Sequence, residues 1–354
     1  MGNQGLMVQR RTPEKRIIYL DVVKCLALLC VVTIHLVAYG VTRHPVGSPI
    51  WIRANYINGP VHVAVPLFVM VSGALLLKPE RQGDWKSFLK RIVRIIVAFV
   101  FWSLIYAAAA CITQDVGPMS FVWRLVTGEY HLWFLFMVAT LYALAPLLCS
   151  IANSDYAWYA IGLCFLSTLL HTASSFLVDV PVLSKIALVF GSWVTDMRFD
   201  AGMLGYFLLG RRIFNMQGPL SHPLNVVWGG VLLVGAGITI FGTWLISINQ
   251  GSTNEYFYQA GSPGIILMAA SIFMLSKSLL SNPRLRKACP RWIAKVADAS
   301  MGIYAVHAGL IMMIADKVAD SLSLMLLAIV PIAFISIIVA LLMKRIPRLG
   351  DIIA

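Results

Sequence analysis

Apolar segments of about 20 residues recur along the whole chain, and this pattern restricts the fold more than any other feature of the sequence. A helix of about 20 residues spans the roughly 30 Å of hydrocarbon in a bilayer. Open sheets leave backbone groups unsatisfied in lipid, so the spans are expected to be helices. Only 12% of the 354 residues are charged, against roughly a quarter in an ordinary soluble domain. The sequence therefore predicts an all-α polytopic bundle of transmembrane helices.

Ten segments are candidate spans, so both termini are expected on the same side of the membrane. The ten segments are 17–40, 60–78, 88–112, 131–150, 155–177, 199–215, 224–248, 262–282, 298–317 and 321–344. The sixth is the shortest. Its neighbour VLSKIALVFGSWV, at 182–194, is apolar but too short to span, so we expect it to be re-entrant or interfacial, or to merge with the sixth span.

The basic residues are distributed unevenly about these spans, which sets the orientation. With both termini in the cytosol, all but six of the 28 Lys and Arg residues lie on cytosolic segments or at inner helix ends. The six on the outer side are Arg43, Arg53, Arg124, Lys185, Arg198 and Lys317. This positive-inside pattern explains the net charge of +13 without nucleic acid as a partner. We expect a cytosolic basic segment over 1–16, one membrane-embedded domain over 17–346 and a cytosolic tail over 347–354.

The first span, YLDVVKCLALLCVVTIHLVAYG, carries three ionisable residues. A helical step of about 100° places Asp21, Lys24 and His35 within an arc of about 60°, with His35 about 21 Å beyond Asp21 along the axis. Ionisable side chains turned to lipid cost several kcal/mol each, so this face is expected to meet a protein interior or a cavity. The alternatives are a cytosolic ion pair of Asp21 with Lys24 and a hydrogen-bonded interior histidine.

Later spans carry further polar candidates. Arg91 and Arg94 lie one turn apart at the cytosolic end of the third span, where they are either topology anchors or a phosphate site. Ser72 and Gly73 are small enough for close helix contact. The fourth and ninth spans contribute Glu129, His131, Trp133, Ser300, Tyr304 and His307. The three in the ninth span lie within about 60° of one another. The six cysteines form no CxxC motif and no cluster with metal-ligand spacing, so no metal site is expected.

Taken together, these segments resemble the acyltransferase-3 family of membrane acyltransferases, and within it the surface-polysaccharide O-acetyltransferases of the enterobacterial common antigen type. The resemblance covers nearly the whole chain. It rests on LDVVK followed by His35, PLF…SG at 66–73, the RxxR pair at 91–94, HLWF at 131–134, GYFLLG at 205–210, SP at 262–263 and S…Y..H at 300–307. Lys24 stands where the family more often has Arg, which keeps the cation but loses a bidentate contact.

The resemblance implies transfer of an acyl group, most often acetyl from acetyl-CoA, to a hydroxyl of an envelope glycan or lipid-linked sugar at the bacterial inner membrane. Histidine has an ordinary pKa near about 6.5 and suits removal of the hydroxyl proton, so His35 is the expected general base. The other catalytic candidates are Asp21 and Glu129. The donor-binding candidates are Lys24, Arg91, Arg94, Ser72 and Tyr304, with Lys24 and Asp21 lining the donor channel. The acceptor-side or supporting candidates are His131, Trp133, Ser300 and His307.

The sequence leaves several alternatives open. No GxSxG motif occurs, which favours direct transfer, although an acyl-histidine intermediate stays open. Aromatic and amide residues in the outer segments 48–58 and 254–263 suit sugar recognition or an interfacial belt. Intramembrane ionisable residues are also typical of a glycan or solute transporter, and a non-catalytic partner of an envelope synthase is a further alternative. The oligomeric state is left open.

Overall fold

The computed structural model describes residues 16–114, 117–177, 201–347 and 350–353, and within these residues it contains helices but no strands. The α-helices are α1 (Ile18–Thr42), α2 (Pro49–Val61), α3 (Ala64–Leu76), α4 (Trp85–Gln114), α5 (Pro118–Thr127), α6 (Trp133–Ala152), α7 (Ala157–Leu177), α9 (Ala201–Asn215), α10 (His222–Gln250), α11 (Pro263–Leu280), α12 (Pro283–Ala288), α13 (Trp292–Asp298), α14 (Ser300–Val318), α15 (Leu322–Met343) and α16 (Gly350–Ile353). Three short 3₁₀ helices connect them: η1 (Pro79–Arg81), η2 (Tyr130–Leu132) and η3 (Tyr256–Tyr258). The predicted all-α class is confirmed.

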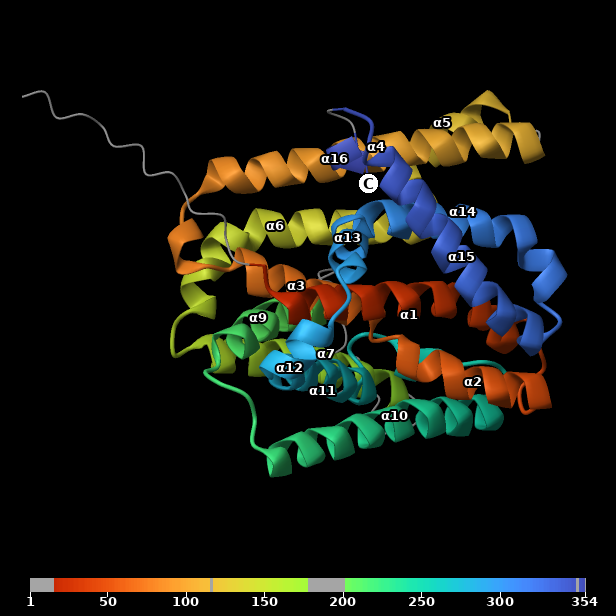
Figure 1. Ribbon diagram of the computed structural model, residues 1–354. Coiled ribbons are helices and arrows are strands. Elements are labelled where there is room, and N and C mark those ends of the chain that lie inside the picture. Colours follow the sequence, from red (N-terminus) through yellow and green to blue (C-terminus); the bar gives the residue numbers. More distant parts are fainter. Residues whose placement is uncertain (1–15, 115–116, 178–200, 348–349, 354) are drawn as a thin grey trace, which may run out of the picture.

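Most of the long helices run roughly parallel or antiparallel, and α1 lies in the middle of the bundle (Figure 1). Eight candidate spans among the described residues are long and apolar enough to cross a membrane, so the chain is an integral multi-pass membrane protein. The spans predicted at 155–177 and 199–215 correspond to α7 and α9, which are not among these eight. The stretch 182–194 lies outside the described residues.

The second span begins earlier than the sequence predicts and is broken in the middle. The segment expected to be an outer loop, 48–58, is mostly helix α2. Ser48 caps this helix by accepting a hydrogen bond from the backbone N–H of Trp51, and Pro49 occupies the first position, where its missing N–H costs nothing. Helix α2 ends at Val61, and α3 begins at Ala64. Irregular backbone at this depth is tolerated where protein covers it, and the His62 ring stacks on Tyr258 with centroids 4.6 Å apart.

Helices α3 and α9 cross in direct backbone contact. A Cβ atom at Gly73 would overlap the carbonyl oxygen of Phe207, and one at Gly210 would overlap that of Met70. Small residues at such a crossing let two membrane helices approach closely, as the sequence analysis expects for Gly73. The contact fixes α3, which carries Phe68 and Ser72 into the site described below.

Two basic residues on the side predicted to be cytosolic, Lys277 and Arg211, also form hydrogen bonds at the ends of helices. Lys277 donates hydrogen bonds to the carbonyls of Ile213, Phe214 and Met216 at the end of α9. The last carbonyls of a helix lack the usual i+4 donor, so a cation there helps to satisfy them and complements the helix dipole. The buried Arg211 side chain likewise donates to Asn153 Oδ1 at 3.0 Å.

Candidate active site

A cavity of about 210 Å³ lies between five helices, α1, α3, α4, α6 and α14. Its lining residues are Lys24, Phe68, Ser72, Arg91, Arg94, Ile95, Phe134, Leu135, Val138, Tyr142, Ser300, Met301 and Tyr304. We call it the cation cavity. All five donor-binding candidates and Ser300, predicted from separate helices, line this one space.

The charged groups of the cation cavity all have the same sign. Lys24, Arg91 and Arg94 line it, and no carboxylate is among its lining residues in the part of the chain that the structure describes. None of the three cations forms an ion pair with another described residue. Cations that share a cavity with no carboxylate in its lining repel one another, which favours the binding of an anion between them.

Three histidines from distant parts of the chain meet beyond the cavity. The ring centroid of His307 on α14 lies 5.2 Å from that of His35 on α1 and 5.9 Å from that of His131 on η2. We call this group the histidine cluster. Tyr130 covers one side, with its ring centroid 5.3 Å from that of His35.

The three histidines differ in accessibility. His131 and His307 are buried, and neither ring has a hydrogen-bonding side-chain partner within the described residues. His35 is only partly buried. A group that removes a proton from a substrate must touch that substrate, so His35 is the member of the cluster best placed for this task.

Tyr304 connects the cation cavity to the histidine cluster. Its ring lines the cavity and lies 5.7 Å, between centroids, from both His131 and His307. Its hydroxyl donates a hydrogen bond to the backbone carbonyl of His131. Phe134, which also lines the cavity, packs on Tyr304 at 5.3 Å. The predicted face of α14 is therefore continuous, with Ser300 and Tyr304 at the cavity and His307 in the cluster.

The segment before α6 holds His131 in place. Gly128 has a φ of 72°, which favours glycine and turns the chain from α5 into η2. Glu129 then caps η2 by accepting from the backbone N–H of Tyr130, and its carboxylate pairs with Arg124 at 3.7 Å. Glu129 thus adjoins the histidine cluster through the backbone, and its predicted catalytic role stays a prediction.

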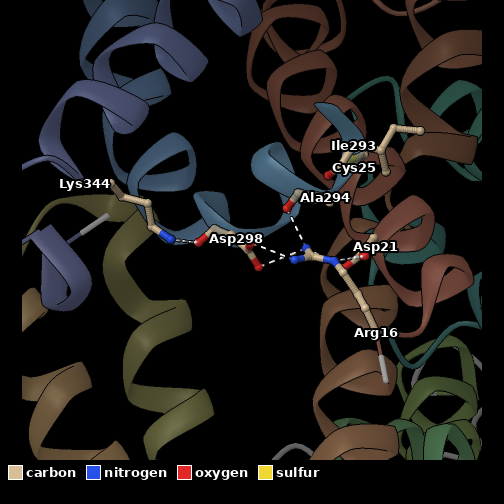
Figure 2. Close-up of polar contacts among 7 residues, drawn as sticks. All are labelled: Arg16, Asp21, Cys25, Ile293, Ala294, Asp298 and Lys344. Atoms are coloured by element: carbon tan, nitrogen blue, oxygen red, sulfur yellow. Dashed lines mark hydrogen bonds and ion pairs between the residues drawn. The ribbon is translucent and has the colours of Figure 1, made fainter. Parts of the chain in front are cut away.

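Asp21 was expected to line the donor channel, but it is not among the residues that line the cavity. Its carboxylate pairs with Arg16 at 2.6 Å, and Arg16 also pairs with Asp298 at 2.8 Å (Figure 2). The hydrogen bonds that the Arg16 guanidinium donates to Asp298 and Asp21 hold its pKa above its usual range. The partner of Asp21 is thus Arg16, two residues before α1, and not Lys24.

Sequence reasoning missed several residues of the site. Tyr130 stands between Glu129 and His131 in the sequence, so the EYH run was an available signal for it. Tyr106 gave no such signal: its hydroxyl donates to the carbonyl of Ala305, and its ring lies 5.1 Å from that of His131. Trp133 was a candidate, but its side chain is half exposed and does not line the cavity.

Within the described residues, no group of three or more His, Cys, Asp or Glu side chains is arranged to hold a metal ion. The spacing of the histidine rings thus differs from that of a metal site.

The chain matches one known family over nearly its whole length. The family model named Acyl_transf_3, described as an acyltransferase domain, matches residues 17–345. Comparisons with curated proteins and with solved structures found no significant match. The matched range contains the cation cavity, the histidine cluster and all eight candidate spans. The chain therefore belongs to the acyltransferase 3 family and is a membrane-bound acyltransferase.

Proposed function

We propose that this acyltransferase moves an acetyl group from cytosolic acetyl-CoA to a hydroxyl of an envelope glycan or lipid-linked sugar. The observation that carries the proposal is the junction of a cation-only cavity with a cluster of histidines through Tyr304. A transporter also uses intramembrane ionisable residues, but membership of an acyltransferase family favours the enzyme.

The donor would enter at the cavity. Arg91 and Arg94 suit the phosphates of CoA because a guanidinium binds phosphate through two parallel hydrogen bonds. The cavity of about 210 Å³ is smaller than the roughly 300–1,000 Å³ of pockets that enclose drug-sized ligands. It therefore suits the acyl-bearing arm of CoA better than the whole molecule. The apolar wall formed by Phe68, Phe134 and Met301 matches the uncharged arm.

The chemistry would take place at His35. The acceptor hydroxyl oxygen attacks the thioester carbonyl carbon while its proton passes to the His35 imidazole. The C–S bond then breaks, and the departing CoA sulfur takes the proton from His35. The ester forms, the thiol is released and His35 returns to its neutral state, so direct transfer needs no further reactant.

The residues around His35 would orient the reacting groups without taking part in the proton transfer. His131 and His307 flank the reacting centre, and Tyr130 closes one side of His35. Glu129 would fix η2, and with it His131. These roles follow from the contacts within the histidine cluster.

Donor recognition gives the direct test. Purified protein should bind acetyl-CoA and bind acetyl-pantetheine, which lacks the nucleotide phosphates, far more weakly, because the three cations would lose their anionic partner. Titration calorimetry in detergent measures both. Mass spectrometry of envelope glycans from a deletion strain should show lost O-acetyl groups, and the wild-type gene should restore them. Equal binding of the two thioesters together with unchanged glycans would contradict the proposal.

The proposed route also requires the cation cavity to open toward the cytosol. A cysteine replacing exposed Arg53 on α2 should react with an impermeant thiol reagent added to intact cells, whereas one replacing exposed Gln82 after η1 should react only after lysis. The parent protein, with its six native cysteines, is the control. The reverse pattern would show that the topology is inverted, and the route from cytosolic donor to outer acceptor would fail with it.

A further inference from the structure

The ion pairs of Arg16 join α1 to the end of α13, directly before α14, and α1 and α14 both line the cation cavity. Its guanidinium donates to Asp21 on α1, to Asp298 at the end of α13 and to the carbonyl of Ala294 (Figure 2). The Lys344 ammonium donates to the backbone carbonyl of Asp298, so the end of α15 reaches the same point. We call Arg16, Asp21 and Asp298 the Arg16 clamp.

Both aspartates of the Arg16 clamp lie close in the sequence to residues that line the cation cavity. Asp21 is one helical turn before Lys24 on α1, and Asp298 is two residues before Ser300, which begins α14. Lys24 and Ser300 both line the cavity. Both carboxylates of the clamp also interact electrostatically with Lys24. The distance between α1 and the start of α14 therefore sets the distance between two cavity walls.

An ion pair also joins α1 and α14 at the end of α1 away from Arg16. Arg43, directly after α1, pairs with Asp316 in the last turn of α14 at 3.1 Å. This pair is exposed, and neither of its members lines the cation cavity. It connects α1 with α14 without touching the donor site, which makes it a suitable control.

We infer that the Arg16 clamp is a positioning device for donor binding, which holds α1 and α14 at the spacing where Lys24 and Ser300 together contact the acyl-CoA. The inference rests on the proposed function. It gives Asp21 a role through Arg16 in place of direct contact with the donor.

The direction in which the acetyl-CoA affinity changes distinguishes a positioning role of the Arg16 clamp from a purely electrostatic one. Asp298→Asn removes a negative charge near an anionic donor and leaves Arg16 less neutralised, so Coulomb interactions alone would tighten binding. Positioning gives the opposite result. We expect Asp298→Asn to raise the Kd for acetyl-CoA about two- to fivefold, as for loss of an exposed ion pair. Turnover at saturating acetyl-CoA should change much less, because the histidine cluster is untouched.

The controls make the test specific. Asp316→Asn should leave the Kd unchanged. Arg16→Lys should give an intermediate Kd, because an ammonium cannot bridge two carboxylates with the fixed fork of a guanidinium. Titration of acetyl-CoA into each purified variant decides between these outcomes. An unchanged or tighter Kd in Asp298→Asn, or an equal loss in Asp316→Asn, would overturn the inference.

A second measurement needs no donor. The Cys25 thiol, one helical turn after Asp21 on α1, donates to the carbonyl of Ile293 on α13 (Figure 2). Loss of the Arg16–Asp298 pair should let α13 move away from α1 and expose the Cys25 thiol. Cys25 should therefore react faster with a maleimide in Asp298→Asn but not in Asp316→Asn. Mass spectrometry of the labelled peptide measures the rate. An unchanged rate would overturn the clamp. If the wild-type protein failed to bind acetyl-CoA, acetyl-CoA would be excluded as the donor. The Cys25 labelling rate would still test whether the Arg16 clamp holds α13 against α1.

Discussion

His35→Ala should abolish acyl transfer, with a fall in turnover of about 100- to 10,000-fold, the usual contribution of a general base. Donor affinity should stay near the wild-type value, because Tyr304, and not His35, lines the cation cavity. The measurement is the O-acetyl content of envelope glycans in a deletion strain that expresses the variant, together with acetyl-CoA titration of the purified protein. A lost activity with intact binding separates the chemical step from donor recognition.

The control for this experiment is His222→Ala. His222 is exposed at the start of α10 and belongs neither to the cavity nor to the cluster. This variant should retain full transfer. Near-normal transfer by His35→Ala would contradict its assignment as the base, and His131 and His307 would be the next residues to test.

Removal of either cavity arginine should weaken acetyl-CoA binding strongly. Loss of a charge-assisted hydrogen bond costs about 1.5–3 kcal/mol, or about 10- to 150-fold in Kd. Arg91→Ala is expected to have the larger effect, because Arg91 is half-buried and Arg94 is exposed, and charge interactions strengthen away from water. Arg91→Lys should restore only part of the affinity, since an ammonium cannot bind phosphate bidentately.

Lys90→Ala is the matched control for the arginines. Lys90 is exposed beside Arg91 on α4 and does not line the cavity. Its removal should leave the Kd for acetyl-CoA unchanged. If Arg91→Ala also bound acetyl-CoA as the wild type does, the arginines would act as topology anchors only.

Much of the fold was predictable because hydropathy and helical period are local properties. The first predicted span, 17–40, became α1 at Ile18–Thr42, and the tenth, 321–344, became α15 at Leu322–Met343. The predicted loop at 48–58 became helix α2 because hydropathy undervalues the polar residues Asn55 and Asn58, which are buried against other helices. Asn55, for example, accepts a hydrogen bond from Tyr258, more than 200 residues away, at 2.6 Å.

In the candidate site, too, relations within one helix were predictable from the sequence, whereas relations between helices were not. The sequence alone determined which residues share a helical face: Lys24 with His35 on α1, and Ser300 with Tyr304 and His307 on α14. Helical geometry fixes these relations within about three turns, whatever the surroundings. Only the tertiary structure decided that His131 completes the histidine cluster and that Asp21 pairs with Arg16. These relations join residues on different segments, so they depend on which helix faces pack together, and that packing is set by long-range contacts such as the crossing at Gly73 and Gly210.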